Sequence, residues 1–220
     1  MCWNQYVSFN TFAFGVFALL LIYFNNKYSP YKISMLNNEF DYIFFLSFLF
    51  MQFFEFLLWR NLDNKRLNSI ISYFASLLLF IQPIASLFLL KNITERNKLL
   101  TIYLIPATLY MLYKTINGKF YTKVSKSGHL AWVWGELYGN KIISFIIHVF
   151  YLFFLYYALV KNKNYYAVLY SGFLLAITYY SFYKDGSAGS LWCWSVNIVF
   201  IFLIIQLLIY LPFQEYKSIC

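Results

Sequence analysis

Hydrophobic residues fall in seven long, continuous runs that short polar segments separate. A helix that crosses a membrane needs about 20 mostly apolar residues, because each residue adds about 1.5 Å and the hydrocarbon layer is about 30 Å thick. Strands of a membrane barrel would instead alternate apolar and polar residues over about ten positions. The pattern therefore predicts transmembrane helices at residues 7–24, 42–59, 69–90, 99–114, 141–160, 165–183 and 191–212.

Composition supports this interpretation. Of the 220 residues, 62% are hydrophobic and 11% are charged, whereas a soluble domain is about half apolar and a quarter charged. So few charges cannot cover the surface of a water-soluble domain, and so many apolar residues exclude intrinsic disorder. We expect an all-α fold in which residues 1–220 form a single transmembrane domain.

The net charge of +9 would suggest a nucleic-acid partner in a soluble protein. Here the Lys and Arg residues lie between the apolar runs, where they flank membrane helices. We therefore predict membrane lipids as partners and no nucleic acid. The cations divide almost equally between the two sides, so neither the orientation nor the organelle follows.

Tryptophan is distributed unevenly across the predicted bundle. With seven crossings, all six tryptophans fall on the side of the N-terminus: Trp3, Trp59, Trp132, Trp134, Trp192 and Trp194. An ordinary aromatic belt populates both membrane interfaces. The asymmetry predicts a Trp-lined vestibule on the N-terminal face, although a one-sided belt would give the same count.

Glu55 lies inside the second predicted helix. Together with Gln52 and Trp59 it follows the i, i+3, i+7 spacing of one helical stripe. A carboxylate within a membrane is costly unless it faces a bundle interior or a wet cavity, which indicates a pathway residue. Alternatively, Glu55 reaches the interface beside Arg60, as long charged side chains often do.

The segment 129–139 is too apolar for an ordinary loop and too short to cross the membrane alone. It predicts an extra interfacial or re-entrant helix. On such a helix His129, Trp132 and Glu136 would share one face. The alternative is an amphipathic surface helix continuous with the next span.

Two further polar residues lie within predicted spans, His148 in the fifth and Asn197 in the seventh. Either could point at Glu55, or each could make a single interhelical hydrogen bond. Cys2 and Cys193 both precede a tryptophan on the N-terminal face. They could form a disulfide if that face lies in an oxidising compartment.

Motifs for known chemistry are missing. The two histidines have no zinc-site spacing, and the sequence has no G-x-S-x-G nucleophile elbow. We therefore predict no metal, no cofactor and no catalytic residue, and the sequence favours a protein that is not an enzyme.

Three segments carry a resemblance: MCWNQYVSFNTF at residues 1–12, MQFFE at 51–55 and GSLWCW at 189–194. They resemble a group of small polytopic membrane proteins of large DNA viruses and protists. The resemblance implies a viral multi-pass membrane protein, for which host endomembrane, plasma membrane and virion membrane all stay open as locations. Because the group has no assigned activity, it implies no functional residue.

We expect a small-solute or ion transporter, or a channel-like protein, with proton coupling as an option. Its pathway would be formed by Glu55, Gln52, His129, Glu136, His148, Asn197, Trp59, Trp132 and Trp194. Alternatives are a lipid-acting enzyme within the membrane and a scaffold that binds lipid or a partner. A small solute, a proton or ion, and a second copy of the chain are candidate partners.

Overall fold

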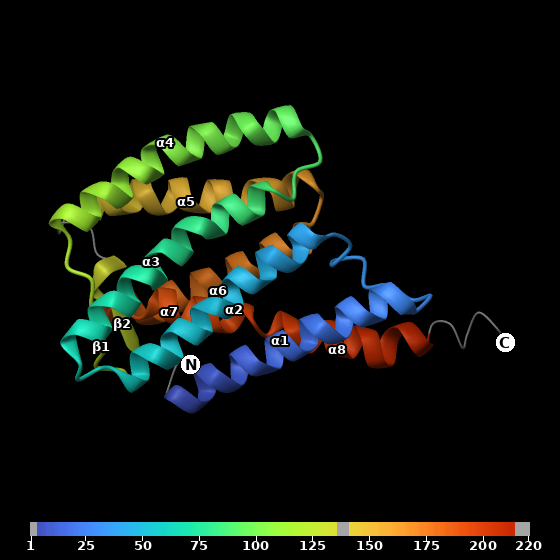
Figure 1. Ribbon diagram of the computed structural model, residues 1–220, viewed down its shortest axis with the longest axis horizontal. Coiled ribbons are helices and arrows are strands. Elements are labelled where there is room, and N and C mark those ends of the chain that lie inside the picture. Colours follow the sequence, from blue (N-terminus) through green and yellow to red (C-terminus); the bar gives the residue numbers. More distant parts are fainter. Residues whose placement is uncertain (1–3, 136–140, 214–220) are drawn as a thin grey trace.

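Long helices run back and forth along one axis in the computed structural model, which describes residues 4–135 and 141–213 (Figure 1). The first six are α1 (Gln5–Tyr28), α2 (Glu39–Arg60), α3 (Lys65–Leu87), α4 (Ile93–Asn117), α5 (Lys141–Lys161) and α6 (Tyr165–Phe182). Between α4 and α5 lie β1 (Thr122–Val124), β2 (Leu130–Trp132) and η1 (Val133–Gly135). The last described elements are η2 (Tyr183–Asp185), α7 (Ala188–Val196), α8 (Val199–Ile205) and η3 (Gln206–Tyr210).

Six helices of the described chain are long and apolar enough to cross a membrane. They are α1 to α5 and the stretch Ala188–Phe213, which contains α7, α8 and η3. The all-α multi-pass class is thus compatible with the structure. The helix α6 is not among the six; five of its 18 residues are tyrosines, which lower its hydropathy.

Asparagine begins four of these helices. The side chains of Asn4, Asn38, Asn64 and Asn92 accept hydrogen bonds from backbone N–H groups in the first turns of α1 to α4. Such N-caps satisfy donors that have no partner within the helix. At α2 the cap is reciprocal, because the carboxylate of Asp41 also accepts from the Asn38 backbone at 3.0 Å.

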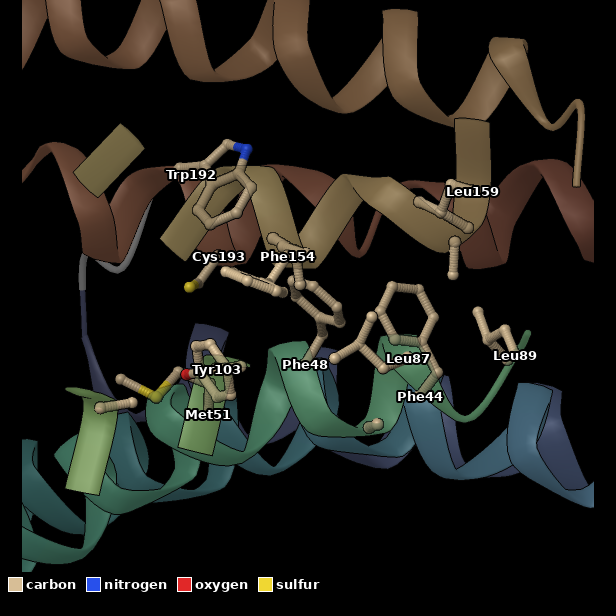
Figure 2. Packing of buried hydrophobic residues seen from close by; sticks show 14 of the residues in the cluster. Phe44, Phe48, Met51, Leu87, Leu89, Tyr103, Phe154, Leu159, Trp192 and Cys193 are labelled. Carbon is tan, nitrogen blue, oxygen red and sulfur yellow. The ribbon is translucent and has the colours of Figure 1, made fainter. Parts of the chain in front are cut away.

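The core lies between α2, α3, α5 and α7. The helix α3 packs against α2, α4 and α5, while α7 packs against α2 and α6. Figure 2 shows Phe44 and Phe48 of α2, Phe154 of α5 and Trp192 of α7 within this cluster, and the rings of Phe48 and Trp192 are 6.2 Å apart. Interlocking aromatic rings hold the bundle together here.

The contact between α1 and α2 is close because Gly15 has no side chain. A Cβ atom at this position would lie 2.1 Å from Cδ2 of the fully buried Leu49. A small residue allows two membrane helices to approach each other in this way. The α1–α2 pair is therefore tightly packed.

The predicted interfacial helix at 129–139 is wrong for its described part. Residues 130–132 form a strand paired antiparallel with β1, with Thr122 opposite Trp132, and η1 follows. The hairpin turns at Gly128, whose φ of 79° suits glycine. Leu130, Ala131 and Trp132 are all buried, so this apolar run is a buried strand. A short apolar run fits a helix and a buried strand equally well, which is why the helical spacing was misleading here.

The predicted helix 191–212 is not one regular helix. It begins earlier, at Ala188, and is interrupted at Asn197 and Ile198, where α7 ends and α8 begins. The Asn197 Nδ2 atom donates to the Cys193 carbonyl at 2.7 Å. A side chain that bonds its own backbone competes with helical hydrogen bonds, which accounts for the break.

Candidate functional site

The hairpin and the starts of α1, α3, α5 and α7 lie at one end of the bundle, called the N-terminal end below (Figure 1). Trp59 lies one residue before the end of α2, at this same end. Five tryptophans of the described chain belong to elements there: Trp59, Trp132, Trp134, Trp192 and Trp194. Trp3 lies outside the described residues.

Gln52 and Glu55 form a polar centre on α2. Neither side chain has any exposed surface. The Gln52 Nε2 atom donates a hydrogen bond of 2.9 Å to Oε2 of Glu55. Residues three apart share one side of a helix, so α2 turns an amide and a carboxyl group together into the bundle. A buried carboxyl group of this kind inside a membrane protein indicates function.

The helix α1 contributes Ser8 to the same level of the bundle. The rings of Phe9 and Phe56 are 5.1 Å apart, which sets the register between α1 and α2. Ser8 precedes Phe9 and Glu55 precedes Phe56 in the sequence. Ser8 and Glu55 therefore lie within about one helical turn, about 5 Å, of each other along the bundle axis.

The helix α7 forms the third wall. The indole N–H of Trp194 donates to the hydroxyl of Thr11 on α1 at 3.0 Å, and α7 also packs against α2. Ser190 lies one turn before Trp194, toward the N-terminal end, and Ser187 lies one residue before α7. Three helices thus enclose the polar centre.

Several buried polar atoms in the half of the bundle toward the N-terminal end have no hydrogen-bond partner among the described residues. They are Oγ of Ser8, Oε1 of Gln52, Nε1 of Trp59, Nε1 of Trp132 and Oγ of Ser187. Each such atom costs about 1–3 kcal/mol, and native proteins leave few of them unsatisfied. Atoms of this kind are where buried water, an ion or a polar ligand would bind.

His129 on the hairpin lies away from this centre. Its side chain is buried, and its ring stands edge-on to Phe182 at 5.3 Å. Burial lowers the pKa of His129, while nearby Asp185 acts in the opposite direction. Glu136 lies outside the described residues. The described contacts do not join His129 to Glu55, so they lend no support to a carboxylate–histidine reaction centre.

His148 and Asn197 also have surroundings of their own. The Nδ1 atom of His148 lies 2.6 Å from the Ser144 carbonyl oxygen, and its ring is 6.1 Å from that of Tyr179. Asn197 bonds Cys193, as described above. Cys193 is a buried free thiol, and Cys2, its expected disulfide partner, lies outside the described residues.

Two cavities lie between the helices, each bordered by α7. The first, of about 470 Å³, lies between α3, α4, α5, α6, α7 and the hairpin. The second, of about 420 Å³, lies between α2, α5, α6 and the α7–α8 break. Trp192 lines both and separates them. The described residues that line them do not include Glu55, so neither is the vestibule expected from the sequence.

Sequence reasoning missed two residues that the structure makes prominent. Lys114 was assigned to the membrane flank, but it is buried and donates to the Trp134 carbonyl. It shares the buried side of α4 with Tyr103 and Ala107, and this spacing could have indicated it. Asn68 bonds the backbone of Thr122 across 54 residues, a contact that no local pattern reveals.

Comparisons with known proteins found no match among protein families, curated proteins or solved structures. The viral resemblance and the predicted self-association therefore stay predictions. Within the described residues, no group of three or more His, Cys, Asp or Glu side chains could hold a metal ion.

Proposed function

We propose that this multi-pass membrane protein moves a proton or a small cation across the membrane, with Glu55 as the exchanging carboxyl group. The observation that carries the proposal is the complete burial of Glu55 beside Gln52 within a bundle of apolar helices. Proton and ion pathways in membranes use carboxyl groups in such positions. The oxygen atoms of Ser8, Gln52 and Ser187 would hydrate a proton or coordinate a hard cation.

The interruption between α7 and α8 supports the same function. Transporters commonly place their ion sites where a transmembrane helix is discontinuous. Here the break at Asn197 is followed by the π-helical turn η3, a feature common at functional sites. The oxygen Oδ1 of Asn197 is buried and has no hydrogen-bond partner within the described part of the chain, so a polar group also lies at the break.

A flux assay tests the proposal. The full chain is reconstituted into phosphatidylcholine liposomes that contain a pH-sensitive dye, and a potassium diffusion potential drives protons inward. We expect faster acidification than in empty liposomes. The substitution Glu55→Gln, which keeps the shape and removes the exchangeable proton, should lower the rate at least tenfold. Parallel assays with sodium and potassium indicators identify the ion.

The matched control is Glu39→Gln. Glu39 is an exposed carboxylate at the start of the same helix, so its loss should leave the flux unchanged. Thermal unfolding of both variants in detergent verifies that they are folded. If liposomes that contain the wild-type protein conduct protons, sodium and potassium no faster than empty liposomes, the proposed transport function is wrong. If Glu55→Gln conducts like the wild type, the role of Glu55 is wrong.

A further inference from the structure

The second cavity, between α2, α5, α6 and the break that separates α7 from α8, has its mouth on the side of the bundle. Tyr166 on α6, Ile198 at the break and Phe202 on α8 all line the cavity, and all three are exposed on the outer surface. The mouth therefore lies between α6 and α8. Because the stretch Ala188–Phe213 is a candidate membrane span, a ligand would enter this cavity from the lipid.

Charged groups are almost absent from the walls of this cavity. Among the described residues that line it, Asp41 is the one charged side chain, and Lys, Arg and His do not occur. The Asp41 carboxylate accepts hydrogen bonds from the backbone N–H groups of Asn37 and Asn38, so it serves the start of α2. An anionic headgroup would find no cation in these walls and would be repelled by Asp41. The lining therefore excludes an anionic ligand.

Asn197 gives the cavity a hydrogen-bond acceptor. Its side chain is 4% exposed and lines the cavity beside the break. The Nδ2 atom donates to the Cys193 carbonyl at 2.7 Å, whereas Oδ1 is buried and has no hydrogen-bond partner in the part of the chain that the structure describes. Because an amide oxygen can only accept, the group that pairs with it must carry a hydrogen.

Tyr156 on α5 gives the same cavity a hydroxyl group. This hydroxyl is buried and lies near that of Ser171, but it makes no hydrogen bond of normal length and angle with any described residue. The Ser171 hydroxyl donates to the Ala167 carbonyl at 2.7 Å instead. Tyr156 and Asn197 both interact with Cys193, so their two polar groups lie at a similar depth in the cavity.

We propose that this cavity binds an uncharged lipid alcohol, whose hydroxyl group donates to Oδ1 of Asn197 and accepts from Tyr156. A hydroxyl oxygen both donates and accepts, whereas a carboxylate or an ether oxygen only accepts. The apolar body of the ligand, a sterol ring system or a linear chain, would lie against Phe48 and Trp192. The volume of about 420 Å³ is within the range of about 300–1,000 Å³ that is typical of ligand pockets. Glu55 does not line this cavity, so the site is separate from the polar centre.

Photolabelling tests the inference. The full chain in dodecyl maltoside is irradiated with a hexadecanol probe that carries a diazirine at mid-chain and an alkyne at its end, and mass spectrometry maps the labelled residues. We expect labels on lining residues such as Phe48, Leu155 and Ala167. Hexadecanol should halve the labelling at a concentration at least tenfold lower than hexadecyl methyl ether does, because the ether cannot donate to Asn197. A sterol competitor, tested in parallel, shows whether a rigid or a linear alcohol binds more tightly.

Four variants assign the effect. Asn197→Leu should abolish the preference for the alcohol over the ether. Tyr156→Phe should weaken both competitors alike, because either oxygen can accept from the tyrosine. Tyr157→Phe is the matched control, since this hydroxyl donates to Glu95 and Tyr157 is not among the residues that line the cavity; it should be labelled like the wild type. Ala167→Phe, which fills the cavity from α6, should abolish the labelling.

Each result decides a separate part of the proposal, and none depends on ion flux. Thermal unfolding verifies that the variants are folded. Equal competition by alcohol and ether in the wild type would mean that the two polar groups bind water alone, and the lipid alcohol would be wrong. Stronger competition by hexadecylamine than by hexadecanol would show that Asp41 selects a cation, and would overturn the uncharged ligand. Unchanged labelling of Ala167→Phe would overturn the site.

Discussion

The two sides of the bundle differ in how closely their helices pack. On the side that holds Glu55, α1 and α2 are packed so closely that there is no room for a Cβ atom at Gly15 against Leu49. Around Lys114, by contrast, α3, α4 and α5 enclose a cavity of about 470 Å³. The tight side is closely packed between α1 and α2, whereas the loose side buries empty apolar space.

The two kinds of packing suit two kinds of site. Buried polar groups need fixed neighbours, because electrostatic interactions depend on geometry in a low-dielectric interior. A site for an apolar ligand needs volume and an entrance instead. Trp132 belongs to the hairpin that covers this end of the bundle; it lines the cavity and lies against Gly189 of α7, which lines the same cavity. Because α7 also packs against α2, the hairpin is connected to the tight side through α7.

The largest loss of stability is expected from a substitution that detaches the hairpin from α3. The side chain of Asn68 donates to the Thr122 carbonyl at 2.9 Å and accepts from its N–H at 2.8 Å, in a buried position. Asn68→Ala leaves both backbone groups unsatisfied, at about 1–3 kcal/mol each. We expect the free energy of unfolding in mixed micelles to fall by at least about 2 kcal/mol.

The control for this change is Asn117→Ala, because Asn117 is exposed and makes one bond within its own helix. It should change the free energy of unfolding by less than about 0.5 kcal/mol. If the two alanine variants have the same free energy of unfolding, Asn68 does not fix the hairpin, and the hairpin does not connect the two sides.

Hydropathy predicted the helices well but placed their starts late. The runs were expected from residues 7, 42, 69 and 99, whereas α1 to α4 begin at Gln5, Glu39, Lys65 and Ile93. Each helix starts with a polar first turn after an asparagine cap. Hydropathy cannot detect such a turn, but the N-cap preference of asparagine could have located it.

The candidate site was only partly predictable. The stripe of Gln52 and Glu55 follows from helical spacing, and the structure bonds these two side chains. The surroundings of His148 do not follow from the sequence, because they depend on how α5 packs against α6. The hairpin was missed because a short apolar run fits a helix and a buried strand equally well.

A pair of identical substitutions measures the contrast in packing. Ala18 on α1 is fully buried on the tight side, while Ala107 on α4 lines the cavity. Ala18→Leu should lower the free energy of unfolding by about 1–3 kcal/mol, because overpacking forces side chains and backbone to shift. Ala107→Leu should be neutral or slightly stabilising, since it fills existing space. Equal losses, measured by chemical unfolding, would show that the two sides are packed alike.

The smallest expected effect is the pH dependence of stability that comes from His129 in the hairpin. Burial lowers its pKa below the ordinary 6.5, so the folded state binds this proton less readily than the unfolded state does. The stabilising contribution is therefore complete above about pH 6.5 and declines as the pH falls from there toward the lowered pKa. We expect thermal unfolding midpoints that drop between pH 7.5 and pH 5 in the wild type, and a smaller drop in His129→Gln.

The chain has two histidines, which makes the origin of this effect easy to assign. In the variant His148→Gln, the remaining imidazole resonance belongs to His129, and NMR titration measures its pKa directly. A value below 6.5 would agree with burial of the ring beneath Phe182. A value above 6.5 would mean that Asp185 outweighs burial, and the hairpin would then gain stability as the pH falls.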